Sequence, residues 1–293
     1  MAFSKVAVIG AGVMGQGISQ TIASIGTEVL LFDVNRESLD AGIKALSDEM
    51  DHEIERWGMT AAEKKAIFSR IKKSTNLEDT SDYQLVIEAI PEDLKLKNDL
   101  FSKLDKFCPP ETIFVTNTST LSITALAAST KRPDKLLGLH FLNPVPKIPL
   151  VEIVKGLNTS EDTYNKVNEF AQQLGKTTVR VTEYPGYITT RIIVPLLNEA
   201  MHVLMEGVAS ASDIDTAIKL GYGFNIGPLA LADKMGLDVV MDWMENLLEE
   251  LSEHKYNPCP LLRKMVYAGN LGVKTGQGFF KYDTEGNRIL EES

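Results

Sequence analysis

Two polar residues interrupt apolar runs in the segment LLGLHFLNPVPKIPLVEIV, residues 136–154: His140 in the first run and Glu152 in the second. A histidine in an apolar strand is more often a hydrogen-bonded core residue than a catalytic one. Here a carboxylate follows in the next run, and facing side chains of paired strands lie ~4.5–5.5 Å apart, within reach of a carboxylate–imidazole hydrogen bond. That bond would fix the ring tautomer and leave the other nitrogen free for proton transfer. The pair therefore predicts general acid–base chemistry.

A second candidate site is the loop IGAGVMG, which places Gly10, Gly12 and Gly15 in the spacing G-x-G-x-x-G, with Met14 among them. Alone the pattern is weak, because glycines mark many ordinary turns. Here it follows an apolar run, opens a helical pattern and meets Asp33 at the end of the next run, near the ~20-residue offset of dinucleotide-binding units. The glycines permit a tight turn and let the backbone approach a pyrophosphate at the helix N-terminus. We therefore expect a dinucleotide site.

Asp33 indicates which dinucleotide binds. Its carboxylate would accept hydrogen bonds from the adenosine ribose hydroxyls and would repel a phosphate at the 2′ position, so NAD is favoured over NADP. Two alternatives stay open, because Asp33 could be a solvated loop acid and nearby Arg36 could hold a 2′-phosphate. A bound nicotinamide beside the His140–Glu152 pair would make a dehydrogenase, which needs a base for the alcohol proton as hydride leaves carbon.

Short apolar runs and helical patterns alternate along the first two-thirds of the chain. The runs are KVAVIG, EVLLFD, LVIEAI, TIFVTNTS and LLGLHF. Continuous runs of this length are typical of a parallel sheet covered on both faces. Between them, residues 91–107 repeat apolar side chains at Leu96, Leu100 and Leu104, as a helix does. The alternation predicts a doubly wound α/β domain of the Rossmann type, with LVEIVKG and KTTVRVT as further strands at the end of its sheet.

The pattern changes after YPGY, residues 184–187, beyond which only helical segments follow. SASDID, residues 210–215, indicates a capped helix start, with Ser210 or Ser212 as the N-cap. The turn at Pro185-Gly186 predicts a domain boundary. We therefore expect an NAD-binding domain over residues 1–184 and an all-α domain over residues 185–293 that binds substrate and dimerises.

Composition narrows the classes of function. The 293 residues carry a net charge of −10, which argues against general nucleic-acid binding. No apolar run reaches the length of a membrane span. The start, MAFSKVAVIGAG, enters a strand pattern at once and predicts no signal peptide. Cys108 and Cys259 have no metal-ligand spacing and favour a reducing compartment. We expect a cytoplasmic protein without a metal site.

Several longer motifs occur in a fixed order: GAGVMGQGI, IEAIPEDLKLKNDLF, TNTSTLSI, GLHFLNPVP, LVEIV and KTGQGFFKY. With them the whole chain resembles the L-3-hydroxyacyl-CoA dehydrogenase family, and in particular its short bacterial 3-hydroxybutyryl-CoA members. The resemblance implies a homodimer and NAD-dependent interconversion of (S)-3-hydroxyacyl-CoA, with short acyl chains, and 3-oxoacyl-CoA. It also implies a place in fatty-acid or butanoate metabolism.

Residue roles follow from the same resemblance. It implies that His140 is the general acid–base and that Glu152 orients it. It further implies that Ser119 and Asn143 bond near the reacting oxygen and the nicotinamide. Glu92 and Lys97 would line the cofactor and substrate cleft, and Lys274 would close over the cofactor. Taken without the resemblance, three of these residues have plainer interpretations: Ser119 as a helix cap, Asn143 as a turn residue and Lys97 as part of a solvated helix face.

Two features depart from the family pattern. In GYITTR, residues 186–191, Thr190 stands where the family has asparagine; a hydroxyl offers one rotatable proton in place of an amide and a carbonyl. Thr190 could still bond the substrate oxygen. The helix after the second strand is rich in acids where the family carries lysines for coenzyme A, although cations lie nearby at Lys44, Arg56, Lys64 and Lys65. Two alternatives therefore stay open: a dehydrogenase of a free hydroxy acid or sugar acid, and a nucleotide-binding protein with an impaired active site.

Overall fold

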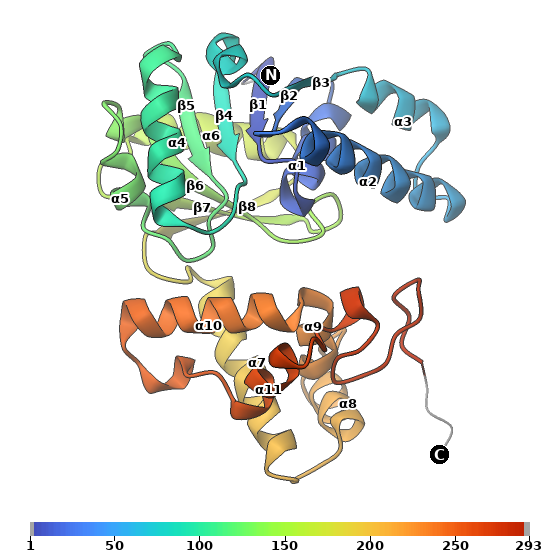
Figure 1. Cartoon of the computed structure of the whole chain (residues 1–293). Helices are drawn as coiled ribbons and strands as arrows, with labels where there is room; N and C mark the ends of the chain where they lie inside the picture. The colour runs from blue at the N-terminus through green and yellow to red at the C-terminus, as the bar shows by residue number, and fades with distance from the viewer. Residues whose placement is uncertain (1–2, 290–293) are drawn as a thin grey trace. The chain divides into compact units, whose positions relative to one another are not determined.

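A computed structural model describes residues 3–289, which divide into two units, one ending at Tyr184 and the other beginning at Pro185 (Figure 1). The first unit is built on a sheet and the second on helices, as the sequence indicated. Each is described by itself.

Within the described residues, the sheet of the first unit has eight strands in the order β3-β2-β1-β4-β5-β6-β7-β8. They are β1 Lys5–Ile9, β2 Glu28–Phe32, β3 Ile71–Ser74, β4 Leu85–Glu88, β5 Ile113–Thr116, β6 Leu136–Phe141, β7 Leu150–Lys155 and β8 Thr177–Thr182. LVEIVKG and KTTVRVT are strands at the end of the sheet, as predicted. One pair of neighbouring strands, β6 and β7, runs antiparallel. The short connection from Leu142 to Pro149 cannot form the crossover that parallel strands need.

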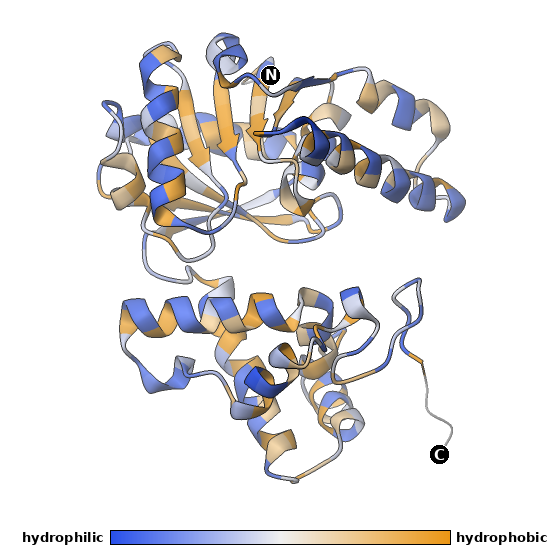
Figure 2. Ribbon diagram, in the orientation of Figure 1, coloured by the Kyte–Doolittle hydropathy of each residue, from blue (hydrophilic) through white to orange (hydrophobic). Residues whose placement is uncertain are grey.

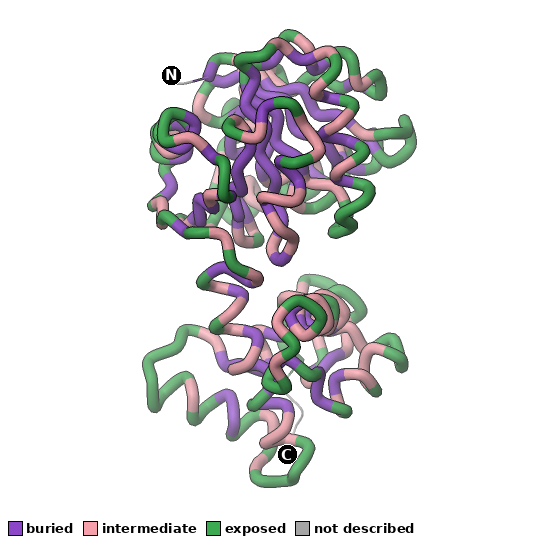
Figure 3. Tube along the Cα trace, turned by 90° about the vertical axis from the view of Figure 1, so that its left-hand side faces the viewer, coloured by how far each residue is buried: buried purple, intermediate pink, exposed green. Residues whose placement is uncertain are grey.

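Helices cover both faces of this sheet. They are α1 Val13–Ser24, α2 Arg36–Glu55, α3 Ala61–Phe68, α4 Leu94–Phe107, α5 Ile123–Ala127 and α6 Glu161–Gln173, with short 3₁₀ turns at Leu77–Asp82 and Pro133–Lys135. One buried cluster joins apolar side chains of α1, α2 and α6 to alternate strand residues such as Val6, Val8 and Leu31. On the other face, Phe101 of α4 stacks on Phe114 of β5, with ring centroids 5.8 Å apart. The central strands are therefore mainly apolar and buried, whereas the edge strands β3 and β8 carry exposed residues (Figures 2 and 3).

The strand order reverses between β1 and β4, and this is where an open α/β sheet binds ligands, at the carboxyl ends of its strands. The two strands are followed by backbone segments in close contact. A Cβ atom on Gly10 would lie 2.6 Å from the carbonyl oxygen of Ala89, and the φ angle of Gly10 is +105°. Only glycine fits this position.

The second unit is helical. Its elements are α7 Thr189–Met205, α8 Ala211–Tyr222, α9 Pro228–Met235, α10 Leu237–Leu251 and α11 Pro260–Tyr267, with 3₁₀ turns at His254–Tyr256 and Val273–Thr275. Its core joins α7, α9, α10 and α11 through Val194, Leu197, Leu229, Val240, Met244 and Leu262. Ser210 is the N-cap of α8, its hydroxyl accepting from the N–H of Asp213, which decides between the two predicted caps.

Two buried carboxylates hold this helical unit together. Asp215 of α8 accepts from two N–H groups in the first turn of α9, at 2.8 and 3.0 Å. Asp233 of α9 accepts from the N–H groups of Phe279 and Phe280 and from a tyrosine hydroxyl, at 2.9 to 3.0 Å. Burial raises the pKa of both carboxyls, although these hydrogen bonds oppose the shift. Between residues 3 and 289 no helix combines the length and apolar character needed to cross a membrane.

Candidate active site

The antiparallel pairing of β6 and β7 brings His140 directly opposite Glu152. Nδ1 of the imidazole lies 2.6 Å from Oε2 of the carboxylate, and the two residues are only 2% and 1% exposed. A carboxylate accepts, so Nδ1 carries the proton and donates it. Nε2 of the neutral ring is then an acceptor, and the Ser119 hydroxyl, 3.1 Å away, donates to it. The predicted pair is present, and Ser119 belongs to the same hydrogen-bonded chain.

Ser119 lies on the loop that follows β5. The loop is tied to the end of β6, because the side-chain oxygen of Asn117 accepts from the N–H of Phe141 at 2.9 Å. The helix-cap interpretation of Ser119 is wrong, since Ser122 is the N-cap of α5. Asn143 is exposed two residues beyond the end of β6. The connection between β6 and β7 therefore carries Asn143 close in sequence to the histidine, and its contact with the reacting oxygen stays a prediction.

A second polar cluster lies buried next to this loop. The ammonium of Lys97, a residue only 1% exposed, donates to Glu88 at 2.8 Å and contacts Glu92 at 3.1 Å. Glu88, fully buried at the end of β4, also accepts from the hydroxyl of Thr116 at 2.6 Å and from the N–H of Ile90 at 2.7 Å. The solvated-face interpretation of Lys97 is therefore wrong. As a contact of the cofactor, Lys97 stays a prediction.

The three charges of this cluster act on one another. Burial raises the pKa of Glu88, and the opposing effect of Lys97 does not cancel it. Burial would also raise the pKa of Glu92, but the charge of Lys97 and the hydrogen bonds of Thr118 outweigh it, so that this pKa is lowered. The two carboxylates in turn outweigh desolvation and raise the pKa of Lys97. Lys97 and Glu92 are therefore both charged at neutral pH.

The sequence carried a signal for Glu88 that the prediction did not use. Glu88 stands inside the apolar run LVIEAI as His140 stands inside LLGLHF. A charged residue in a buried strand needs a partner of opposite charge. Lys97 is that partner, and the two are nine positions apart along the chain.

The glycine loop fits the pyrophosphate of a dinucleotide. It joins β1 to α1, and a Cβ atom on Gly12, the N-cap of α1, would meet no atom within 4 Å, so the space before the helix N-terminus is open. A Cβ on Gly15 would lie 1.8 Å from the carbonyl oxygen of Gly10, so the helix start packs directly on the loop. The N–H groups in the first turn of α1 are available to an anion. Met14, in that turn, packs against the core.

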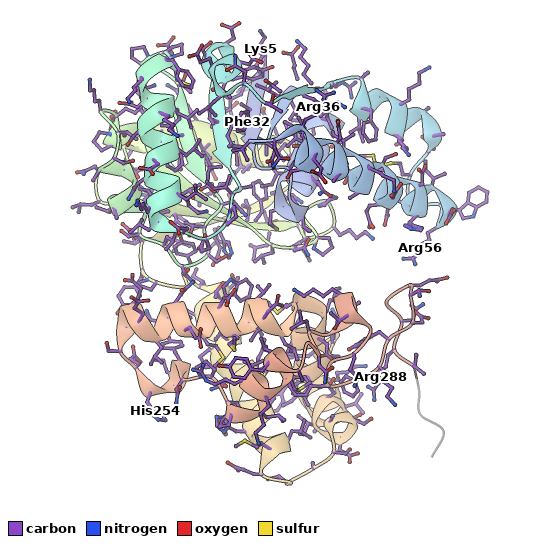
Figure 4. All side chains as sticks on the ribbon, in the orientation of Figure 1. Lys5, Phe32, Arg36, Arg56, His254 and Arg288 are labelled. Carbon is purple, nitrogen blue, oxygen red and sulfur yellow. The ribbon has the colours of Figure 1, made fainter. Side chains whose placement is uncertain are left out.

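Asp33 follows β2 at the same edge of the sheet. Its carboxylate accepts from the N–H of Ala11 at 2.9 Å and from its neighbour Val34 at 2.8 Å. Arg36 opens α2, and Figure 4 labels it together with Phe32, the last residue of β2. The guanidinium of Arg36 donates to Asp40 at 2.9 Å. Asp33 therefore shapes the glycine loop directly, while the charge of Arg36 is paired locally.

The cations considered for coenzyme A are partly paired as well. Lys44 donates to Asp48 at 3.1 Å, and Lys64 contacts Asp51 at 2.6 Å. Arg56, directly after α2, and Lys65, on α3, are exposed. The acids of α2 therefore compensate the nearby lysines, and these contacts single out no basic patch.

Two predicted site residues belong to the helical unit. Thr190 is 2% exposed in the first turn of α7. Lys274 lies in the turn Val273–Thr275, and its ammonium donates to Asp238 of α10 at 2.5 Å. Gly236 adjoins this pair, because a Cβ atom there would lie 3.3 Å from the ammonium nitrogen. Their roles toward cofactor and substrate stay predictions.

Gly42 of α2 gives a test of how tightly the glycine loop is packed. A Cβ atom there would lie 2.3 Å from the carbonyl oxygen of Ala11. Alanine normally stabilises a helix relative to glycine, but here overpacking dominates, and Gly42→Ala should lower the free energy of unfolding by about 1–3 kcal/mol. Urea denaturation measures this change. In the control Gly221→Ala on α8 the new Cβ meets open space, and stability should rise by about 0.5–1 kcal/mol; similar effects in both variants would contradict the proposed close packing.

A dinucleotide-binding loop and a buried acid–base histidine in one α/β sheet define a nicotinamide-dependent dehydrogenase. The family models of 3-hydroxyacyl-CoA dehydrogenase match nearly the whole chain, the NAD binding domain over residues 5–184 and the C-terminal domain over residues 186–282. The chain belongs to the 3-hydroxyacyl-CoA dehydrogenase family, as its motifs predicted.

Individual relatives agree with this assignment. A probable 3-hydroxybutyryl-CoA dehydrogenase of Bacillus subtilis is 46% identical over 283 residues, which cover 97% of this chain and 99% of the relative. The human mitochondrial hydroxyacyl-coenzyme A dehydrogenase is 40% identical, with 94% and 90% covered. The crystal structure of the (S)-3-hydroxybutyryl-CoA dehydrogenase PaaH1 from Ralstonia eutropha is 41% identical, has a TM-score of 0.88 and covers 96% of this chain and 100% of its own.

Proposed function

We propose that this dehydrogenase interconverts (S)-3-hydroxybutyryl-CoA and acetoacetyl-CoA with NAD as its cofactor. The observation that carries the proposal is the hydrogen-bonded chain Ser119–His140–Glu152, which belongs to the same α/β unit as the dinucleotide loop. The similar proteins of Bacillus subtilis and Ralstonia eutropha, both named 3-hydroxybutyryl-CoA dehydrogenases, support the acyl-CoA class of substrate. A free hydroxy acid as substrate and an impaired nucleotide-binding protein are not favoured.

The proposed mechanism assigns one proton to His140. NADH, when bound, supplies a hydride to carbon 3 of the 3-oxoacyl thioester. The imidazolium of His140 gives its Nε2 proton to the carbonyl oxygen, which becomes the hydroxyl, and in the reverse direction neutral Nε2 takes that proton back. Glu152, fixed at Nδ1, stabilises the positive charge of the ring. The thioester bond stays intact throughout.

Other residues would place the reacting oxygen. The Ser119 hydroxyl and the Asn143 amide are proposed as its hydrogen-bond donors, and such donors act most strongly in a site that excludes water. Thr190 is proposed to add a third contact, with its hydroxyl in place of the family's asparagine. Glu92, Lys97 and Lys274 remain candidates for contacts with the cofactor.

NAD is proposed over NADP. The carboxylate of Asp33 stands at the end of β2, where it would accept from ribose hydroxyls and repel a 2′-phosphate. The competing role of Arg36 is weakened by its hydrogen bond to Asp40, which also accepts from Lys73 at 3.0 Å. Because the negative charge of Asp33 disfavours a 2′-phosphate, the two ribose hydroxyls are the groups that it is proposed to recognise.

A homodimer through the helical unit is also proposed. Ile192 of α7 is 66% exposed, although Leu197 is fully buried in the core. Two neighbouring apolar residues of α7, Ile193 and Leu196, are partly buried against that core. The exposed part of this helix is a surface that a second copy could cover. The cytoplasmic location and the metabolic pathway stay predictions.

The proposed function is tested by oxidation of NADH in the presence of acetoacetyl-CoA. NADH should turn over with the thioester and should be preferred to NADPH by roughly tenfold or more, the effect of one charge-assisted hydrogen bond of ~1.5–3 kcal/mol. Free acetoacetate should be inactive, and free coenzyme A should inhibit. No turnover with the thioester, with NADH still bound, would reject the proposal.

A further inference from the structure

We infer that Glu92 is a positioning residue: its carboxylate sets the conformation of the loop that carries Ser119, and buried Lys97 holds that carboxylate in place. The inference rests on the proposed function, because it acts through the contact between Ser119 and His140. It differs from the role that family resemblance implies for Glu92, which is to line the cofactor cleft.

One oxygen of Glu92 receives the loop. Oε1 accepts from the N–H of Ser119 at 3.0 Å, from the N–H and hydroxyl of Thr120, each at 3.1 Å, and from the hydroxyl of Thr118. The donors come from three consecutive residues that lie outside any helix or strand. Hydrogen bonds to an ionised carboxylate are about twice as strong as neutral ones. Glu92 therefore supplies to this segment the acceptor that secondary structure supplies elsewhere.

The other oxygen of Glu92 faces Lys97. Oε2 lies 3.1 Å from the ammonium nitrogen, which is also 2.8 Å from Glu88. Because Lys97 is only 1% exposed, its ammonium would have to leave two carboxylates to reach a ligand. Its contacts thus serve Glu92, and the order of contacts from the helix to the ring is Lys97, Glu92, the Ser119 backbone and the Ser119 hydroxyl.

The loop is held at both sides of the serine. On the side of β5, Asn117 bonds the end of β6 at the N–H of Phe141. On the side of α5, the Thr118 hydroxyl accepts from the N–H of Leu121 at 2.9 Å. Between these points the backbone N–H of Ser119 donates to Glu92. Loss of its carboxylate should free the serine hydroxyl to leave Nε2 of His140.

The test is a double-mutant cycle on kcat with acetoacetyl-CoA and NADH. Glu92→Ala should lower kcat by up to about a hundredfold, the effect of an ångström-scale misplacement. In the Ser119→Ala background the same change should cost almost nothing, because the group through which it acts is gone. Glu92→Gln keeps one acceptor oxygen for the loop but turns an amide toward Lys97, so its kcat should lie between those of Glu92→Ala and the wild type. Additive losses, or a weakened Kd for NADH at unchanged kcat, would overturn the inference.

Asp105→Asn is the matched control. Asp105 lies in the last turn of α4, the helix that begins two residues after Glu92, and it also accepts from a backbone N–H, that of Lys131 at 2.9 Å, and from a cation, Arg132 at 2.7 Å. The Asp105→Asn variant should have a lower free energy of unfolding and an unchanged kcat. A kcat loss in this variant as large as in Glu92→Ala would assign the effect to general destabilisation and would overturn the inference.

A spectroscopic readout separates this inference from the proposed function. The chain has four histidines, so the imidazole nitrogen resonances of His140 can be assigned by substitution. The Nε2 resonance should shift in Ser119→Ala and shift alike in Glu92→Ala, but not in Asp105→Asn. This comparison needs no turnover, so an inactive wild type would reject the proposed function alone, whereas an unmoved Nε2 resonance in Glu92→Ala would reject the inference alone.

Discussion

His140→Asn should lower kcat for acetoacetyl-CoA reduction by about 10²–10⁴-fold, the usual contribution of a positioned general acid–base. Asparagine is chosen because its amide nitrogen takes the place of Nδ1 and can still donate to Glu152, which is 1% exposed and needs a donor. The substitution removes Nε2, the atom that faces Ser119. The loss should therefore appear in proton transfer and not in folding.

The measurement is kcat at saturating thioester and NADH, together with the Kd for NADH from fluorescence titration. The Kd should stay within about twofold, since the dinucleotide loop joins β1 to α1, while His140 is on β6. The control His52→Asn changes an exposed histidine of α2 and should leave kcat unchanged. A kcat within tenfold of the wild type in His140→Asn would remove the histidine from the proposed chemistry.

The sequence predicted the parts of the fold that depend on local pattern. Continuous apolar runs marked β1, β2, β4, β5 and β6, because strands buried on both faces cannot alternate. β3 was not predicted, since its four residues, IKKS, include two exposed lysines and form no apolar run. The direction of β7 was not predicted. It is antiparallel to β6 because the connection before it is too short for a crossover, which is a constraint of chain length and not of strand pattern.

The apolar face predicted for α4 differs from the face that is buried. The sequence indicated an apolar face at Leu96, Leu100 and Leu104, but Leu96 is 46% exposed. The buried face instead begins at Lys97 and continues through Leu100, Phe101 and Leu104. Lys97 and the three apolar residues of this face follow helical spacing. The pattern was missed because a lysine is normally taken to be a surface residue. Its two carboxylate partners are what permit the burial.

Contacts that depend on distant segments could not be predicted from pattern alone. The pairing of His140 with Glu152 was accessible, because two polar residues in neighbouring apolar runs suggest partners. The bond from Glu92 to the backbone of Ser119 joins residues 27 positions apart, in the segments that follow β4 and β5. Such a bond depends on how the segments after the neighbouring strands β4 and β5 meet, which is a property of the assembled sheet.

Lys97→Met should lower the free energy of unfolding by about 3–5 kcal/mol at neutral pH, because it leaves Glu88 buried without its cation and removes the cation from Glu92. Methionine matches the length of the lysine stem, so the packing of α4 is kept and the missing charge dominates. Urea denaturation followed by circular dichroism measures the change. The control Lys95→Met removes an exposed lysine from the same helix and should change stability by less than about 0.5 kcal/mol.

The pH dependence of this deficit distinguishes lost charge from lost packing. In the wild type the pKa of Glu92 is lowered, so its contribution to stability is present above the ordinary value of 4.5 and is lost as pH falls. In Lys97→Met the pKa of Glu88, which burial already raises, should rise further, and the pKa of Glu92 loses the lowering effect of Lys97. A group with a raised pKa contributes its stability below the unfolded value and loses it as pH rises. The difference between the two proteins should therefore shrink from about pH 7 to about pH 5, and a deficit independent of pH would assign it to packing.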